Sequence, residues 1–239
     1  MNLNRQVLYK ECDVHLWKSH LPEVVPSYDC LSKEEQGRSA RFRRYEDRAR
    51  FNKVHTFLKS VLQRYTHLPP EEIHFAHGHN GKPVLKCRHL HPPVYFNLSY
   101  RGDYALLAIS NSPFIGVDVE RIKPIDDILT FTSDYFSPPE EEKILGPLSR
   151  AGQRSMVYTF WTMKEALIKA LATGFLNPIK EYDLSSFLYA PYQTLRDSHI
   201  WHIRRLPMER NYKAAFAVRA EKVNCSVFHY GCKIDQIFF

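Results

Sequence analysis

The segment at residues 115–120 constrains the fold of this chain more than any other, because its side chains alternate in chemistry. It reads Ile-Gly-Val-Asp-Val-Glu. Successive side chains of a β-strand point to opposite faces, so Val117 and Val119 share one face while Asp118 and Glu120 share the other. Carboxylates on a buried face are costly unless they bind a cation or pair with a positive charge. The pattern therefore predicts a strand with a cation-binding face, or else an edge strand whose polar face meets water.

The segment at residues 160–170 has the spacing of an amphipathic helix. It reads Phe-Trp-Thr-Met-Lys-Glu-Ala-Leu-Ile-Lys-Ala, with an apolar stripe at helical intervals. Glu165 and Lys169 lie four residues apart and share the opposite side with Lys164. Alone, such a face is ordinarily solvated surface. Beside the acidic strand it indicates a divalent cation and a phosphorylated ligand, because Mg²⁺ takes a few carboxylates and completes its octahedron with phosphates and water.

The remaining patterns favour an α+β fold of two similar halves, each a small, mostly antiparallel sheet packed with helices. Helix starts are predicted at Ser32 and Ser137, and apolar spacing predicts a helix over residues 46–65. The helix that carries Lys164 should stop near Gly174. Strands are predicted at residues 7–17, 73–76, 83–87, 94–98, 104–110, 114–122, 182–189, 199–206 and 212–219.

The order of these elements repeats, which divides the chain into residues 1–112 and 113–239, although no repeat of individual residues is evident. We expect the strands at 104–110 and 114–122 to be joined by a hairpin-type connection. We also expect the second of these strands to be central in its sheet. Its Gly116 would let a ligand or another backbone approach closely.

Composition narrows the class of protein. The chain has 239 residues, 44% of them apolar and 25% charged, which argues against disorder. No apolar run approaches the roughly 20 residues that a membrane helix needs, and the N-terminus lacks the apolar core of a secretory signal. The five cysteines are scattered without a close pair, as in a cytoplasmic protein with reduced thiols. A net charge of +7 favours an acidic partner, either a polyphosphate, a nucleic acid or an acidic protein.

The two segments described first resemble the paired signatures of the 4′-phosphopantetheinyl transferase superfamily. Three further segments are similar to parts of the same family: residues 41–50, residues 81–83 with 96–99, and residues 136–140. The length and the two-halved layout resemble its larger, monomeric class, the Sfp-like enzymes. The resemblance covers about residues 32–175.

The resemblance implies an enzyme that moves phosphopantetheine from coenzyme A to a serine of an apo acyl or peptidyl carrier protein. By this resemblance Asp118, Glu120 and Glu165 would hold Mg²⁺, or Mn²⁺, against the pyrophosphate of coenzyme A. Glu165 would also help to remove the serine proton. Lys164 and Lys169 would bind phosphate oxygens, so that Glu165, Lys169 and Asp118 form the catalytic set.

The adenosine end of coenzyme A would meet Arg38, Arg50 and Lys82, with Ser99 lining the site. The alternative for these basic residues is ordinary surface charge. Tyr100 stands where the family usually has a histidine that contacts a phosphate of coenzyme A, and tyrosine carries no positive charge. Arg101 is the residue that could supply this charge instead.

Two other functions remain as alternatives. A metal-dependent nuclease would combine acidic residues with a glutamate and a lysine, but such enzymes usually place that pair on a strand. A non-catalytic basic module for nucleic acid would leave Asp118 and Glu120 without a purpose, because without a metal they repel phosphate. We therefore expect coenzyme A and a carrier protein as partners, no nucleic acid or membrane partner, and a monomer.

Overall fold

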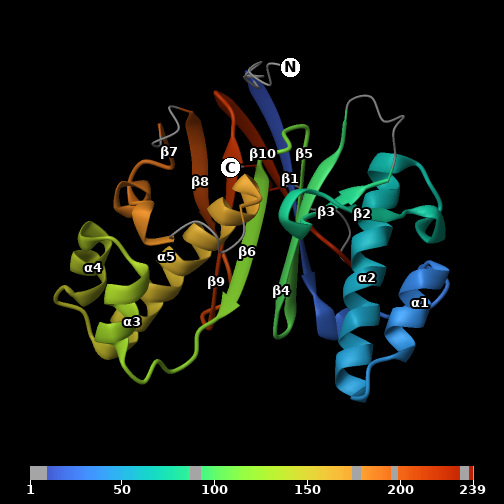
Figure 1. Ribbon diagram of the computed structural model, residues 1–239, viewed down its shortest axis with the longest axis horizontal. Coiled ribbons are helices and arrows are strands. Elements are labelled where there is room, and N and C mark those ends of the chain that lie inside the picture. Colours follow the sequence, from blue (N-terminus) through green and yellow to red (C-terminus); the bar gives the residue numbers. More distant parts are fainter. Residues whose placement is uncertain (1–9, 87–92, 174–178, 195–198, 232–236, 239) are drawn as a thin grey trace.

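Two sheets lie between helices in the computed structural model, which describes residues 10–86, 93–173, 179–194, 199–231 and 237–238. The long helices α2 and α5 flank the strands on opposite sides (Figure 1). The fold is α+β, as predicted, and the two sheets belong mainly to the two halves of the chain. None of the helices described has an apolar stretch sufficient to span a bilayer.

The N-terminal half builds a sheet with the strand order β11-β10-β1-β5-β4 and a small β2-β3 ribbon. Its elements are β1 (Glu11–His20), α1 (Lys33–Ala40), α2 (Tyr45–Thr66), β2 (Phe75–His77), β3 (Pro83–Leu85), β4 (Tyr95–Arg101) and β5 (Tyr104–Ser110). Two strands from the end of the chain, β10 (Lys222–His229) and β11 (Ile237–Phe238), complete this sheet. The division at residue 112 stays a prediction, and β10 crosses it.

The C-terminal half builds a four-stranded sheet with the order β6-β9-β8-β7. Its elements are β6 (Ile115–Arg121), α3 (Ile128–Tyr135), α4 (Pro138–Leu145), α5 (Arg150–Leu171), β7 (Tyr192–Thr194), β8 (Ile200–Leu206) and β9 (Tyr212–Arg219). In each half, a strand leads through a pair or trio of helices to an antiparallel hairpin, β4–β5 or β8–β9.

Three layers of apolar side chains hold these elements together. Helix α2 packs on the outer face of the five-stranded sheet, for example through Phe57 against Leu107. The inner faces of the two sheets meet around Leu106, Val117 and Phe216. Helix α5 covers the outer face of the four-stranded sheet. Because β6 carries Val117 in the middle layer, its alternate side chains are directed toward α5.

The two halves carry a repeat of individual residues that the sequence analysis did not find. Ser137 and Glu140 form a capping box at the start of α4, 105 positions after the capping box of Ser32 and Glu35 at α1. Helices α2 and α5 each have 22 residues and start at positions 45 and 150, again 105 apart. Both end in a non-glycine residue with left-handed backbone, at His67 and Ala172. The predicted similarity of the halves therefore extends to their caps.

Several predicted elements were wrong. Residues 182–189 are not a strand. The backbone N–H of Leu184 donates a hydrogen bond to Glu140, and Lys164 donates one to the carbonyl of Tyr182. Side chains thus provide the hydrogen bonds that a neighbouring strand would otherwise provide. The strands β5 and β6 do not form a hairpin, because β5 pairs with β1 and β4 while β6 pairs with β9. Strand β6 is at the edge of its sheet rather than central.

The other predicted elements are confirmed to within three residues at each described end, and the sequence analysis missed α3, β7, β10 and β11. Helix α5 ends at Leu171, and the predicted stop at Gly174 lies outside the described residues, as does the start of the first predicted strand at residues 7–9.

Candidate active site

The free edge of β6 is closed by side chains of β4 instead of by another strand. Asn97 accepts a hydrogen bond from the backbone N–H of Val117 through its Oδ1 at 2.9 Å, and the hydroxyl of Ser99 accepts one from Val119 at 3.3 Å. These bonds form a seam between the two halves that is lined by polar groups. Ser99, predicted to line the site, lies in this seam.

A close contact between β6 and α5 places the acidic strand against the helix. A Cβ atom at Gly116 would lie 2.0 Å from the carbonyl oxygen of Ala166 and 2.6 Å from the nitrogen of Ala170. Only glycine allows this approach, and of the two alternatives that the sequence left open, a ligand or another backbone, the structure shows the backbone of α5. Glu165 and Lys169 are neighbours of these two alanines on α5, so the contact brings them over Asp118.

Asp118 is buried, with 4% of its surface exposed, and it is the centre of the site. Its Oδ1 accepts hydrogen bonds from the Ser99 hydroxyl at 2.9 Å and from the Lys169 ammonium at 2.6 Å. Lys169 also donates to the Ser99 hydroxyl and to the carbonyl of Val117. The second oxygen, Oδ2, is buried without a hydrogen-bond partner. Asp118 thus has one oxygen to offer to a ligand.

Glu165 is the second acid of the seam. Burial, and then the negative charge of Asp118, raise the pKa of Glu165 to about 7, while Lys169 opposes the shift and Glu120 adds to it. Its Oε1 is buried and has no hydrogen-bond partner. The three acids are therefore close enough to repel one another, and a positive charge between them would relieve that repulsion.

Glu120 is held by an arginine from the other half. Arg101 donates from Nε to Oε2 at 2.6 Å and from Nη2 to Oε1 at 3.0 Å, a two-pronged ion pair. The side chain of Arg101 is 52% exposed and that of Glu120 17% exposed. The pKa of Arg101 is held above its usual value, chiefly by these hydrogen bonds.

The three carboxylates fit a divalent cation in their chemistry but are not gathered into a finished metal site. Among the residues that the structure describes, no three side chains of the ligating types come close enough to hold an ion. Two buried, unpartnered oxygens, Asp118 Oδ2 and Glu165 Oε1, are nonetheless the hard donors that Mg²⁺ prefers. A cation would have to draw the three acids inward.

Comparison with known protein families decides where this site belongs. Residues 15–112 match the family model described as 4′-phosphopantetheinyl transferase, N-terminal, and residues 114–217 match that of the 4′-phosphopantetheinyl transferase superfamily. The chain belongs to the 4′-phosphopantetheinyl transferase superfamily. Its two matched segments follow the two halves of the fold, which is the layout of the Sfp-like class.

Two relatives are similar in sequence to this transferase over most of its length. The chain is 29% identical over 222 residues to the 4′-phosphopantetheinyl transferase HetI of Nostoc sp. (strain PCC 7120 / SAG 25.82 / UTEX 2576), covering 91% of this chain and 92% of that protein. It is 30% identical over 189 residues to the 4′-phosphopantetheinyl transferase Sfp of Bacillus subtilis (strain 168), covering 77% and 80%.

Lys164 of the transferase lies away from the seam in this structure, and its predicted contact with phosphate stays a prediction. Its side chain is fully buried and pairs with the equally buried Glu140 at 2.9 Å. It also donates to the carbonyls of Ile179 and Tyr182. Lys59 pairs with Glu35 in the same way in the N-terminal half. Lys164 therefore holds the capping box and the following turns of its own half in place.

Glu35 has a structural role in the transferase. Its carboxylate accepts from the backbone of Ser32 and from His55 at 2.7 Å, in addition to the ion pair with Lys59. Burial opposes ionisation, but these partners lower the pKa of Glu35 to about 2.

Two of the residues expected at the adenosine end lie together. Arg38 and Tyr100 line a cavity of about 330 Å³ between α1, α2, β2 and β4, with His74 and His77 also in its wall. Arg50 is exposed on α2 and does not line this cavity.

Lys82 is used at the connection between the halves. Its ammonium donates to the carbonyls of Pro113 at 3.2 Å and Ile115 at 2.7 Å. Burial lowers the pKa of Lys82 to about 8. In this conformation Lys82 supports the start of β6 rather than an anion site, which differs from the sequence-based expectation.

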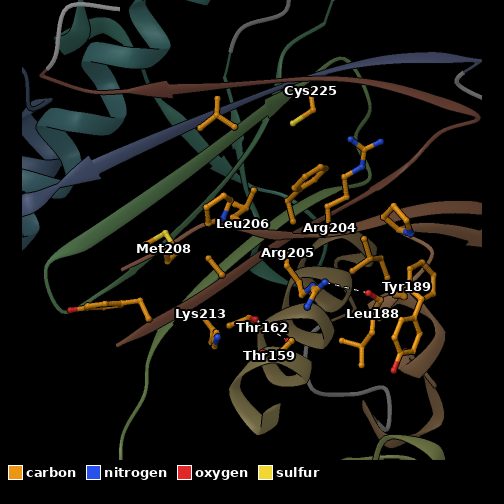
Figure 2. A pocket seen from close by; sticks show the side chains of 18 residues that line it. Thr159, Thr162, Leu188, Tyr189, Arg204, Arg205, Leu206, Met208, Lys213 and Cys225 are labelled. Atoms are coloured by element: carbon orange, nitrogen blue, oxygen red, sulfur yellow. Dashed lines mark hydrogen bonds between the residues drawn. The ribbon is translucent and has the colours of Figure 1, made fainter. Parts of the chain in front are cut away.

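A cavity of about 600 Å³ in the transferase is lined by residues of α5, β8 and β9 (Figure 2). Its wall contains Arg204, Arg205 and Lys213 but no acidic side chain and none of the predicted site residues. Lys213 is the β9 partner of Glu120, so the cavity begins one strand away from the acids. Arg205 donates to the carbonyl of Leu188 at 3.2 Å.

Sequence reasoning missed two features of the seam, Asn97 and the pairing of Arg101 with Glu120, and it also missed Glu140, which holds Lys164 in the core. Asn97, Ser99 and Arg101 alternate along β4, and this polar alternation was a signal that the strand faces another polar edge. Glu140 could have been found from the repeat of Ser32, Glu35 and Lys59 at Ser137, Glu140 and Lys164.

Proposed function

We propose that this transferase moves the 4′-phosphopantetheine group of coenzyme A to a serine hydroxyl of an apo acyl or peptidyl carrier protein. The serine oxygen attacks the β-phosphorus, and the phosphoanhydride bond to adenosine 3′,5′-bisphosphate breaks. The observation that carries this proposal is the seam, where Asp118, Glu120, Glu165 and Lys169 from β6 and α5 come together. The family membership supports the same reaction.

Asp118, Glu120 and Glu165 are the residues that would hold Mg²⁺, with Mn²⁺ as an alternative. The two buried oxygens without partners and the mutual repulsion of the acids support this role. The cation supplies charge neutralisation for the diphosphate, which makes its phosphorus open to attack. Asp118 is fixed for this role by Ser99 on one oxygen.

Lys169 is the residue that contacts the transferred phosphate. Its ammonium donates to Asp118 and Ser99 in this structure, and in the proposal it offsets the charge that develops when the bisphosphate leaves. A lysine acts on phosphate as a point charge, and a preorganised positive charge lowers the barrier to leaving.

Glu165 accepts the proton of the serine hydroxyl, directly or through a water molecule. In the cation-free protein its pKa of about 7 is set by burial and by the other acids. A bound cation keeps carboxylates ionised, so Glu165 would be available as a base at neutral pH.

The adenosine end of coenzyme A occupies the 330 Å³ cavity of the N-terminal half in this proposal. Arg38 offers a positive charge there, and Tyr100 a hydroxyl group. Because Arg50 and Lys82 lie elsewhere, Arg38 is the residue to which we assign the 3′-phosphate.

We propose a monomer that acts in the cytoplasm without a membrane or nucleic-acid partner. Both walls of the seam come from one chain, which supports a monomer. The cytoplasmic location rests on the scattered cysteines of the sequence, which have no close pair.

The reaction is tested by incubating the protein with coenzyme A, Mg²⁺ and a panel of apo carrier proteins, followed by mass spectrometry of each carrier. The proposal predicts a gain of one phosphopantetheine group on at least one carrier, and none when Mg²⁺ is replaced by a chelator. No gain on any carrier, together with cleavage of DNA under the same conditions, would favour a nuclease.

A further inference from the structure

We infer that Arg101 is a positioning residue that competes with the divalent cation for Glu120 and turns to the diphosphate when the cation binds. The inference rests on the proposed function, because it requires a cation at the seam. It concerns an arginine whose partner was not foreseen from the sequence.

The contact itself is the first observation. Arg101 engages both oxygens of Glu120, one through Nε and one through Nη2, at 2.6 and 3.0 Å. A cation that takes this carboxylate must share or displace that fork. Asp118 is in the same state, since Lys169 lies on its Oδ1. Two of the three acids are therefore paired with a basic side chain of the same chain in this structure.

The contact is also able to open. The side chain of Arg101 is about half exposed, and ion pairs at that exposure are weak and screened by salt. Within the described part of the chain, Glu120 is the partner to which the Arg101 side chain donates hydrogen bonds. Release therefore requires only a side-chain rotation and no rearrangement of β4.

The place of Arg101 shows where its charge would go. It ends β4, two residues after Ser99, which touches Asp118 and Lys169, and next to Tyr100 of the smaller cavity. In the proposed binding mode, a diphosphate between this cavity and Asp118 would lie near the end of β4, where Arg101 stands. Guanidinium groups bind phosphate oxygens with two parallel hydrogen bonds, and Tyr100 offers no positive charge there.

The test measures Mn²⁺ binding by electron paramagnetic resonance in the absence of coenzyme A, for the wild type, Arg101→Ala and Arg121→Ala. Arg121 is the matched control because it removes the same charge one residue from Glu120, on the opposite face of β6. We expect Arg101→Ala to bind Mn²⁺ about 3- to 10-fold more tightly than the wild type, and Arg121→Ala to bind it as the wild type does.

A second measurement on the same proteins concerns the affinity for coenzyme A, which should change in the opposite direction to the affinity for Mn²⁺. With Mn²⁺ saturating, Arg101→Ala should bind coenzyme A several-fold more weakly, measured by calorimetry, whereas a purely structural role would change neither affinity selectively. Equal Mn²⁺ affinity in Arg101→Ala and the wild type overturns the inference and leaves the metal site standing. If neither the wild type nor Arg101→Ala binds Mn²⁺, the metal site and the inference are both wrong. If Arg101→Ala binds coenzyme A as tightly as the wild type does, Arg101 does not turn toward the diphosphate.

Discussion

Asp118 combines burial with an incomplete set of partners, and that combination is unusual for a carboxylate. One oxygen is bonded to Ser99 and Lys169, while the other is buried and bare. A buried polar atom that lacks a hydrogen-bond partner costs free energy unless a ligand binds it. At the scale of single residues, Asp118 is therefore the side chain whose geometry is best explained by function and least by stability.

Replacement of Asp118 by alanine should abolish transfer while the fold is kept. Removal of one preorganised electrostatic group typically lowers kcat by about 10²–10³-fold, and Asp118 also fixes Lys169. The measurement is the initial rate of holo-carrier formation, with circular dichroism of the variant as the control for folding. Near-normal turnover in Asp118→Ala would remove the role assigned to it.

Glu35 gives a prediction about pH at the same scale. Because the folded protein lowers the pKa of Glu35 to about 2, the carboxylate contributes stability above its ordinary pKa near 4.5 and loses it as the pH falls toward 2. Glu35→Gln should thus be less stable than the wild type at pH 7, and the difference should shrink progressively below pH 4.5. Urea unfolding at several pH values measures this. A difference that does not change with pH would contradict the assigned pKa.

At the scale of elements, two contacts in the C-terminal third of helix α5 fix its position. One is the approach to Gly116, and the other is the ion pair between Lys164 and Glu140 at the start of α4. Burial raises the pKa of Glu140 and lowers that of Lys164, and each charge opposes the shift of the other. These contacts fix the helix on the sheet and so fix Glu165 and Lys169 over Asp118.

Gly116→Ala should push α5 away from β6. The added methyl group would collide with backbone at 2.0 Å, and overpacking of this kind costs about 1–3 kcal/mol. We expect the transfer rate to fall even under conditions where the variant is still folded, because Lys169 would move away from Asp118. Gly37→Ala in α1 is the control: nothing lies within 4 Å of its Cβ, so it should be neutral or slightly stabilising. Equal effects of the two substitutions would refute the close contact.

Lys164→Met tests the structural role of the buried lysine. It leaves Glu140 charged and buried without its partner, which should cost about 3–5 kcal/mol in the free energy of unfolding. The double variant Lys164→Met with Glu140→Gln should recover part of this loss, as measured by urea unfolding. If Lys164→Met kept wild-type stability but lost affinity for coenzyme A, the original expectation of a phosphate contact would be right after all.

At the scale of the whole molecule, the site lies where two similar halves meet, and this explains what the sequence could and could not predict. The alternation at residues 115–120 and the spacing of 160–170 depend on local geometry, so β6, α5 and the close approach at Gly116 were predictable. Contacts between distant segments were not. Strand β10 pairs with β1 more than 200 positions away, from Glu11 to Lys222, and no local pattern signals such a pair.

The same limit applies to the site. A sequence places Lys164 and Lys169 on one helix, but only the fold shows that Lys164 is turned into the core by Glu140 while Lys169 reaches Asp118. The partnership of Arg101 with Glu120 crosses the seam and depends on how β4 meets β6. The pairing of each acidic side chain with a particular lysine or arginine is determined only when the two halves are assembled.

A crystal structure with coenzyme A and Mg²⁺ bound tests the central claim most directly. The account predicts the cation within about 2.1 Å of oxygens from Asp118, Glu120 and Glu165 and of a diphosphate oxygen, with Arg101 released from Glu120. A diphosphate found instead among Arg204, Arg205 and Lys213 in the larger cavity, with the three acids still apart, would contradict it.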